Sequence, residues 1–138
     1  MAKTRTQDSK NKIGQIPGSM IYTGQRSKQK LFIEAFDFDK ENCVEKELQT
    51  AEESIDFRHT NTITWINLNG LNHVNQIEKL GKLYDLHPLV LEDIVNIKQR
   101  PKIDDYDDYI FVVLKMLYYD DNEKIVSEQV SFILGKNY

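Results

Sequence analysis

Alternating apolar and polar positions predict four β-strands along the chain. Residues 31–38 and 62–68 follow the two-residue period of a half-buried strand, and the second stretch is rich in β-branched and aromatic residues. Residues 109–119 and 125–134 predict two more strands, joined as a hairpin by a short acidic reversal. The first hairpin strand is apolar on both faces, as a strand covered on two sides would be. We also expect Trp65 on a mostly buried strand.

Helical periods fall between these strands. One helix is predicted to be capped by Asn72 and to stop near Asp85, with apolar residues at helical spacing in between. A second, short helix is predicted with His87 as its cap and Pro88 at its first position, where a missing N–H costs nothing. Residues 43–54 are ambiguous between strand and helix. Strands interspersed with helices predict an α/β or mixed α+β fold, with a central mixed β-sheet flanked by helices.

Charge divides the chain into two parts. Residues 1–30 hold seven Lys or Arg and one acidic residue, with no sustained helix or strand period, which predicts a basic and largely flexible tail. Residues 31–138 hold the other eleven basic and twenty-one acidic residues, a net charge of 11 − 21 = −10, and are predicted to form one α/β domain. An acidic body repels nucleic acid backbones and attracts cations, so we expect no nucleic-acid partner.

The sequence predicts a soluble, cytosolic piece of protein. Cys43 is the single cysteine and cannot form an internal disulfide, and no signal peptide opens the chain. The longest strongly apolar run, residues 110–114, is five residues, whereas a helix that crosses a membrane needs roughly twenty. We therefore expect no transmembrane segment within these 138 residues.

The common signatures of catalysis are missing. The sequence contains no Gly-rich phosphate loop, no Cys-x-x-Cys pair and no Gly-x-Ser-x-Gly nucleophile elbow, so we predict that the chain is not an enzyme. The three histidines are widely spaced, and only His87 has a clear local role, as a helix cap. Four aspartates could hold Mg²⁺ or Ca²⁺, but their spacing is not that of an EF-hand, and a solvated acidic loop is the favoured interpretation of Asp104, Asp105, Asp107 and Asp108.

The adjacent pair Glu92 and Asp93 is a more informative acidic feature. Neighbouring side chains on a helix point roughly 100° apart, so these two carboxylates cannot serve the same face. The pair suits a site shared between two surfaces, although ordinary helix surface is the simpler interpretation of the residues by themselves. We expect both side chains on an exposed part of the helix.

Five blocks occur in order from residue 63 onward. They are Ile63-Thr64-Trp65-Ile66-Asn67, His87-Pro88-Leu89-Val90-Leu91-Glu92-Asp93-Ile94, Gln99-Arg100-Pro101-Lys102, Tyr109 with Val113-Leu114-Lys115-Met116, and Ser127-Glu128-Gln129-Val130-Ser131. Together these blocks resemble the CorA family of magnesium and cobalt transporters. The resemblance covers about half of the chain, and Pro17-Gly18 with residues 21–24 also fits it. The Gly-Met-Asn signature of the family, both membrane helices and the long helix leading to them do not occur in this sequence.

The resemblance implies the cytosolic regulatory domain of a transporter. In the family this region is an α/β domain of a homopentamer that lies at the cytoplasmic face of the cell membrane. Regulatory divalent cations, Mg²⁺ or Co²⁺, bind between the domains of adjacent protomers. The Leu-Glu-Asp block contributes acidic ligands there, so by motif Glu92 and Asp93 are the expected metal-binding residues. No family role passes to the aspartates at 104–108.

Three other interpretations fit the same residues. A zinc-transporting relative would share the architecture, and these residues do not name the transported ion among Mg²⁺, Co²⁺, Ni²⁺ and Zn²⁺. An autonomous cytosolic α/β enzyme could use His87 and Asp93, but no nucleophile lies beside them in the sequence. A scaffold module could bind a basic partner through its acidic face, in an association that salt weakens and Mg²⁺ does not affect.

Overall fold

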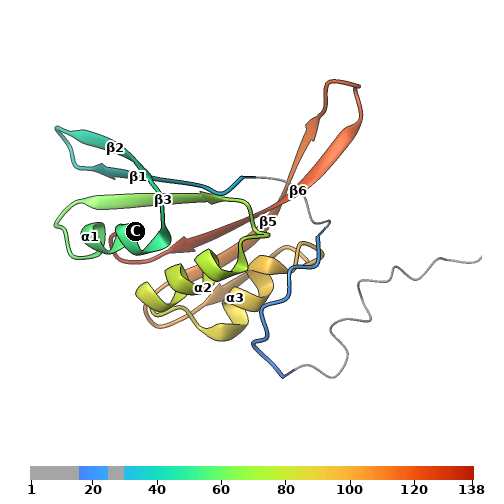
Figure 1. The fold of residues 1–138 in the computed structure, drawn as a ribbon, viewed down its shortest axis with the longest axis horizontal. Coiled ribbons are helices and arrows are strands. Elements are labelled where there is room, and N and C mark those ends of the chain that lie inside the picture. The colour runs from blue at the N-terminus through green and yellow to red at the C-terminus, as the bar shows by residue number, and fades with distance from the viewer. Residues whose placement is uncertain (1–15, 25–29) are drawn as a thin grey trace, which may run out of the picture.

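A computed structural model describes residues 16–24 and 30–138, which fold into two antiparallel sheets with helices packed against one side (Figure 1). Each sheet has three strands, in the orders β2-β1-β3 and β4-β5-β6. The elements are β1 (Phe32–Phe38), β2 (Cys43–Leu48), the 3₁₀ helix η2 (Ala51–Ser54), α1 (Ile55–Arg58), β3 (Ile63–Asn69), α2 (Val74–Leu83), α3 (Pro88–Val95), β4 (Lys102–Asp105), β5 (Ile110–Tyr119) and β6 (Ile125–Leu134).

The first sheet is built around β1, which pairs with β2 on one edge and β3 on the other. Ile33 and Ala35 are buried, and the residues paired with Ile33 are Leu48 on β2 and Leu68 on β3. Since directly paired residues point to the same face, this inner face packs on η2, α1 and part of α2. The outer face carries the alternate positions of β1, among them Phe36.

The second sheet is the long hairpin of β5 and β6 with the short strand β4 at its edge. Phe111 and Val113 on β5 are fully buried beneath α3, and full burial of such a side chain stabilises the fold by about 1.5–3 kcal/mol. The register places Asp104 opposite Phe111 and Lys102 opposite Val113, so both polar side chains lie on the inner face. The far end of the hairpin extends beyond the helices (Figure 1).

Two core clusters hold the sheets and helices together. One lies between the second sheet and the helices α2 and α3, and the other lies between the first sheet, η2 and α1. Leu68 packs against both clusters, which makes the interior continuous. The backbone N–H of Thr64 donates to the carbonyl of Asn137 over 2.9 Å, which ties β3 to the segment after β6.

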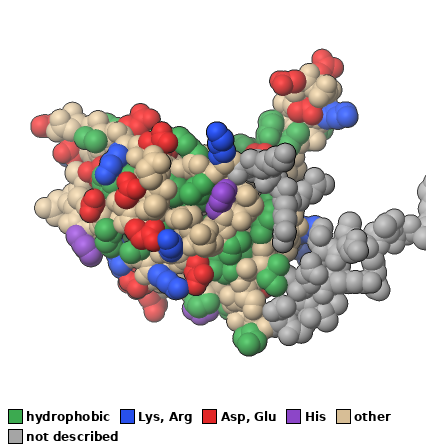
Figure 2. Space-filling model, in the orientation of Figure 1, with side chains coloured by type: hydrophobic (Ala, Val, Ile, Leu, Met, Phe, Trp, Pro, Cys, Tyr) green, Lys and Arg blue, Asp and Glu red, His purple; other side chains and the backbone are tan. Residues whose placement is uncertain are grey.

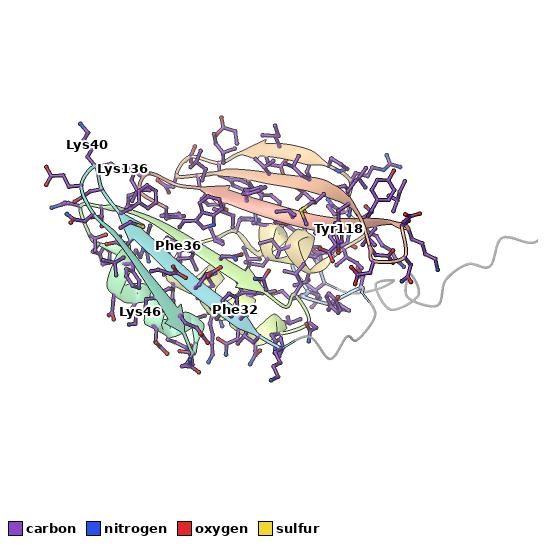
Figure 3. All side chains as sticks on the ribbon, turned by 90° about the horizontal axis from the view of Figure 1, so that it is seen from above. Phe32, Phe36, Lys40, Lys46, Tyr118 and Lys136 are labelled. Atoms are coloured by element: carbon purple, nitrogen blue, oxygen red, sulfur yellow. The ribbon has the colours of Figure 1, made fainter. Side chains whose placement is uncertain are left out.

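The outer face of both sheets carries many apolar side chains. Figure 3 looks onto this side, with Phe32, Phe36 and Tyr118 labelled. Ile103, Trp65 and Leu134 have 72%, 58% and 62% of their surface exposed. The prediction that Trp65 lies on a mostly buried strand is therefore wrong about its burial, because β3 turns Thr64, rather than Trp65, toward the core.

The predicted fold class is confirmed, with one difference in the sheet. The strands form two antiparallel sheets instead of a single mixed sheet, because each strand finds a hairpin or meander neighbour and no parallel pair forms among the described residues. Residues 43–54, ambiguous in the sequence, are split between β2 and η2. No helix in the described ranges is both long and apolar enough to cross a membrane.

Two local predictions are corrected. Asp104 and Asp105 belong to strand β4 rather than to a loop, because they pair with Phe111 and Ile110. His73, and not Asn72, takes the position before α2, and no side chain caps that helix. Residues 1–15 and 25–29 lie outside the described part of the chain, so the flexible basic tail and the boundary at residue 30 stay predictions.

Candidate functional site

Helix α3 carries the Leu-Glu-Asp block, and its start is fixed in two ways. The Nδ1 atom of His87 accepts a hydrogen bond from the N–H of Leu89 over 3.2 Å, which confirms the predicted cap. The hydroxyl of Tyr109 accepts from the N–H of His87 over 2.9 Å and links the cap to the second sheet. With four residues buried in the core, the helix presents its remaining side chains in a defined direction.

Glu92 faces the N-terminal segment of residues 16–24. Its Oε2 atom accepts a hydrogen bond from the backbone N–H of Gly18 over 2.9 Å. Gly18 has a φ of +87°, and a side-chain carbon there would lie 3.1 Å from the Cβ of Pro88, so the close approach favours glycine. Further along, the backbone N–H of Thr23 donates to the carbonyl of Val95 over 3.2 Å. The segment therefore runs along the outside of α3.

Asp93 faces the opposite neighbour, strand β4. Its Oδ2 atom lies 2.6 Å from Nζ of Lys102, and the side chains of Asp93 and Lys102 are 20% and 28% exposed. Lys102 also forms an ion pair with Asp104, two residues along the same strand face. Burial alone would lower the pKa of Lys102, but the carboxylates of Asp104 and Asp93 outweigh it and raise that pKa above its ordinary value.

The end of α3 is held by two polar side chains from the inner face of the second sheet. Nε2 of Gln129 donates to the carbonyls of Asp93 and Ile94, each over 3.1 Å. Nζ of Lys115 donates to the carbonyl of Ile97 over 2.7 Å and to Oε1 of Gln129 over 3.2 Å. Burial lowers the pKa of Lys115. These contacts supply donors to carbonyls of the last turn of α3 and of the loop after it, where the regular hydrogen bonds of a helix end.

The donor set around Glu92 and Asp93 suits a hard divalent cation but is incomplete. Carboxylate oxygens are the ligands that Mg²⁺ prefers. Among residues 16–24 and 30–138, no group of three or more His, Cys, Asp or Glu side chains comes close enough to hold a metal ion. The two carboxylates diverge from one helix, as predicted, but both are partly buried and have partners within the chain, so the expectation of an exposed position is wrong. A cation held here by three or more such side chains would take at least one of them from outside the described residues.

Of the four aspartates at positions 104, 105, 107 and 108, three stay apart from this site. Asp105, Asp107 and Asp108 are exposed, and Figure 2 shows acidic side chains spread over the visible face, with a group at the tip of the β5–β6 hairpin. Only Asp104 connects to the pair, through Lys102. A groove of about 770 Å³ between α2, α3 and the N-terminal segment is lined by eleven residues that include His87 but neither Glu92 nor Asp93.

Sequence reasoning missed Lys102 and Gln129 as neighbours of the acidic pair. Both occur in the blocks that carry the family resemblance. The two-residue period of the hairpin could have placed Gln129 on the face of Phe111 and Val113, whereas Lys102 lies on β4, a strand that the sequence pattern did not predict. The contact with α3 could not be predicted from that period, because it depends on how the helix packs across the sheet.

Comparisons with known proteins point to one family. The family model described as "CorA-like Mg2+ transporter protein" matches residues 60–138. The chain is 41% identical over 127 residues to the cobalt/magnesium transport protein CorA of Thermotoga maritima, a match that covers 91% of this chain and 36% of that protein. It is 36% identical over 59 residues to the putative metal ion transporter YfjQ of Bacillus subtilis, which covers 43% of this chain and 18% of that one. The chain thus spans about a third of the first relative and less of the second.

Proposed function

We propose, since the chain belongs to the family of CorA-like Mg²⁺ transporters, that it is the cytosolic regulatory domain of a magnesium and cobalt transport protein. In the complete protein it would lie at the cytoplasmic face of the cell membrane, as part of a homopentamer. Membership in a transporter family also confirms that the chain is not an enzyme.

The proposed mechanism is feedback by the transported ion. Glu92 and Asp93 bind regulatory Mg²⁺, or Co²⁺, together with acidic residues of an adjacent protomer. Opposed carboxylates at an interface repel one another, and a bound divalent cation relieves the repulsion and so favours the closed assembly. When intracellular Mg²⁺ falls, the cation leaves, the interfaces loosen and conducting states become more populated.

The observation that carries this proposal is the divergent, incomplete carboxylate pair on α3. Two carboxylates on adjacent helix positions supply oxygen ligands in different directions. In the described part of the chain, neither carboxylate belongs to a group of three or more acidic, His or Cys side chains that could hold a metal ion. A weak half-site of this kind gains affinity only where a second surface completes it. Because several such half-sites act on one closed state, small differences in affinity add up to a steep response.

The apolar outer face of the sheets supports the proposal that the domain packs against the rest of a larger protein. Exposed apolar patches of more than a few hundred Å² are uncommon on proteins that work as monomers. Exposed side chains gather on the outer face from both sheets, notably Ile63, Trp65, Ile103, Leu114, Met116, Phe132 and Leu134. The remaining two thirds of a CorA-sized protein is the occupant we propose.

The test replaces both carboxylates by their amides, Glu92→Gln with Asp93→Asn, in the full-length transporter. Protection from protease is measured against Mg²⁺ concentration, with ion uptake followed in parallel. Loss of the two charges should raise the Mg²⁺ concentration at half protection roughly tenfold, which corresponds to about 1.4 kcal/mol of lost coupling. Uptake should then continue at Mg²⁺ concentrations that shut off the unmodified protein.

The control carries the same loss of charge elsewhere, as Asp107→Asn with Asp108→Asn. Both residues are exposed, lie in the turn between β4 and β5 and are not among the partners described for Glu92 and Asp93, so their replacement should leave the protection midpoint unchanged. Thermal unfolding without Mg²⁺ measures any loss of stability, because Asp93→Asn also removes the pair with Lys102, and such partly exposed pairs contribute about 1 kcal/mol at most. If the Glu92 and Asp93 variant keeps the wild-type midpoint, these two residues are not the Mg²⁺ sensor.

A further inference from the structure

Lys102 lies between two carboxylates from different elements. Its Nζ contacts Oδ2 of Asp93 on α3 at 2.6 Å and also pairs with Oδ2 of Asp104 on β4. The register of β4 against β5 directs Lys102 to the inner face, toward the helix, and Nζ lies 5.4 Å from the centre of the Phe111 ring. The strand, the ring and the two carboxylates therefore hold one positive charge beside Asp93.

We propose that Lys102 is an internal counter-ion that competes with the regulatory divalent cation for Asp93, and that Asp104 retains Lys102 when the cation binds. This inference rests on the proposed function, because it takes Asp93 as a cation ligand. Lys102 is a positioning residue and does not itself touch the cation. Its role is to set the concentration of Mg²⁺ at which the domain responds.

The competition follows from charge and distance. A divalent cation on the Asp93 carboxylate would lie within a few ångströms of the ammonium group that now contacts Oδ2. Two positive charges at that separation repel strongly in a partly buried site, where the effective dielectric constant is well below that of water. Binding of the cation and the contact between Lys102 and Asp93 therefore oppose each other, and the apparent affinity falls by the strength of the ion pair.

Asp104 allows the cation to replace Lys102 at Asp93 without leaving the ammonium group of Lys102 unpaired. Residues two apart on a strand share one face, so Asp104 stays beside Lys102 whether or not a cation is bound to Asp93. An ammonium group that lost both partners while partly buried would carry a desolvation cost and would resist displacement. With Asp104 present, Lys102 needs only to shift from two carboxylates to one. Removal of Asp104 should therefore tighten the hold of Lys102 on Asp93.

The experiment measures the Mg²⁺ midpoint of protease protection in the full-length transporter for single and double variants. Lys102→Gln should lower the midpoint roughly fivefold, the effect expected for loss of a partly exposed ion pair. Lys102→Arg, which keeps the charge, should leave the midpoint close to wild type. Asp104→Asn should move it in the opposite direction, to higher Mg²⁺.

Matched controls separate this competition from a general change of charge. Lys82→Met removes a positive charge that pairs with Glu78 on α2, and Asp105→Asn removes the negative charge next to Asp104 on the opposite face of β4. Neither should move the midpoint appreciably. In the Asp93→Asn background Lys102→Gln should have no further effect, because the contested carboxylate is gone.

The outcomes distinguish the counter-ion role of Lys102 from the assignment of Asp93 as a sensor residue. If Asp93→Asn raises the midpoint but Lys102→Gln leaves it unchanged or acts equally in the Asp93→Asn background, the competition is wrong and the sensor assignment stands. If Asp93→Asn itself has no effect, the sensor assignment fails, and the counter-ion role fails with it. Should Lys102→Gln unfold, Asp104→Asn against Asp105→Asn decides, and equal midpoints for those two overturn the proposal.

Discussion

Three polar side chains on the inner face of the second sheet organise the end of α3. Lys102, Lys115 and Gln129 take positions between apolar residues of the same face, and each reaches the helix or the loop that follows it. Buried polar groups are tolerated when their hydrogen bonds are made, and here the partners are helix carbonyls and a carboxylate. This part of the core therefore fixes the orientation of α3 through directed contacts as well as through packing.

Gln129 should be sensitive to the loss of its donor. In Gln129→Glu a carboxylate replaces the amide that donates to the carbonyls of Asp93 and Ile94, so both acceptors lose this donor, and the carbonyl of Asp93 keeps, among the described residues, only the N–H of Asn96. We expect the free energy of unfolding to fall by about 1–3 kcal/mol in urea unfolding of the chain. Glu128→Gln, on the exposed neighbouring position, is the control and should stay within about 0.5 kcal/mol. Equal stability of the two variants would show that these contacts contribute little.

For single residues, the sequence predicts those contacts that form between neighbours in the chain. The pair His87-Pro88 predicts its own helix start, because a capping side chain followed by proline acts within one turn. Asn72 offers the same chemistry, but the chain enters α2 one residue later, and its Oδ1 atom is buried without a hydrogen-bond partner. Tertiary packing there overrides a local preference. The ion pair between Asp93 and Lys102 joins two elements, and no local rule predicts it.

Among the elements, α2 and α3 pack unusually closely where Gly81 faces Leu91. A side-chain carbon at position 81 would lie 2.5 Å from Cδ1 of Leu91, and Leu91 is itself buried. Glycine inside a helix costs about 1 kcal/mol relative to alanine, so its presence here reflects the contact between the helices. The apolar periodicity of both helices is visible in the sequence, whereas the point at which they cross is not.

The substitution Gly81→Ala should therefore destabilise the protein despite the better helix propensity of alanine. The added carbon forces Leu91 to move within a packed core, and overpacking of this kind costs about 1–3 kcal/mol. Thermal unfolding should show a lower midpoint for Gly81→Ala, and the second change Leu91→Ala should no longer add its full separate cost. Asn75→Ala, on the exposed side of the same helix, should be neutral or slightly stabilising. A rise in stability for Gly81→Ala would show that Leu91 and α3 make room for the added carbon at little cost in free energy.

At the scale of the whole molecule, the sequence predicts the strands and their hairpin but not which face remains uncovered. The run from 110 to 114 is apolar on both sides and suggests a strand buried twice. In the structure α3 covers the side of Phe111 and Val113, and the other side carries exposed apolar residues. Periodicity identifies two apolar faces, but their partners can lie in protein that these 138 residues do not include.

Trp65 offers a direct measurement of that uncovered face. It is the single tryptophan of the chain, it is 58% exposed, and it lies opposite Phe36 on the outer side of the first sheet. In the isolated 138-residue chain, acrylamide should quench its fluorescence nearly as well as in the urea-unfolded chain. In the full-length transporter, with Trp65 kept as the sole tryptophan, quenching should be several-fold weaker, because we propose that the rest of the protein covers the apolar face. A quenching constant as high as in the isolated chain would mean that this face stays open to water in the assembled protein.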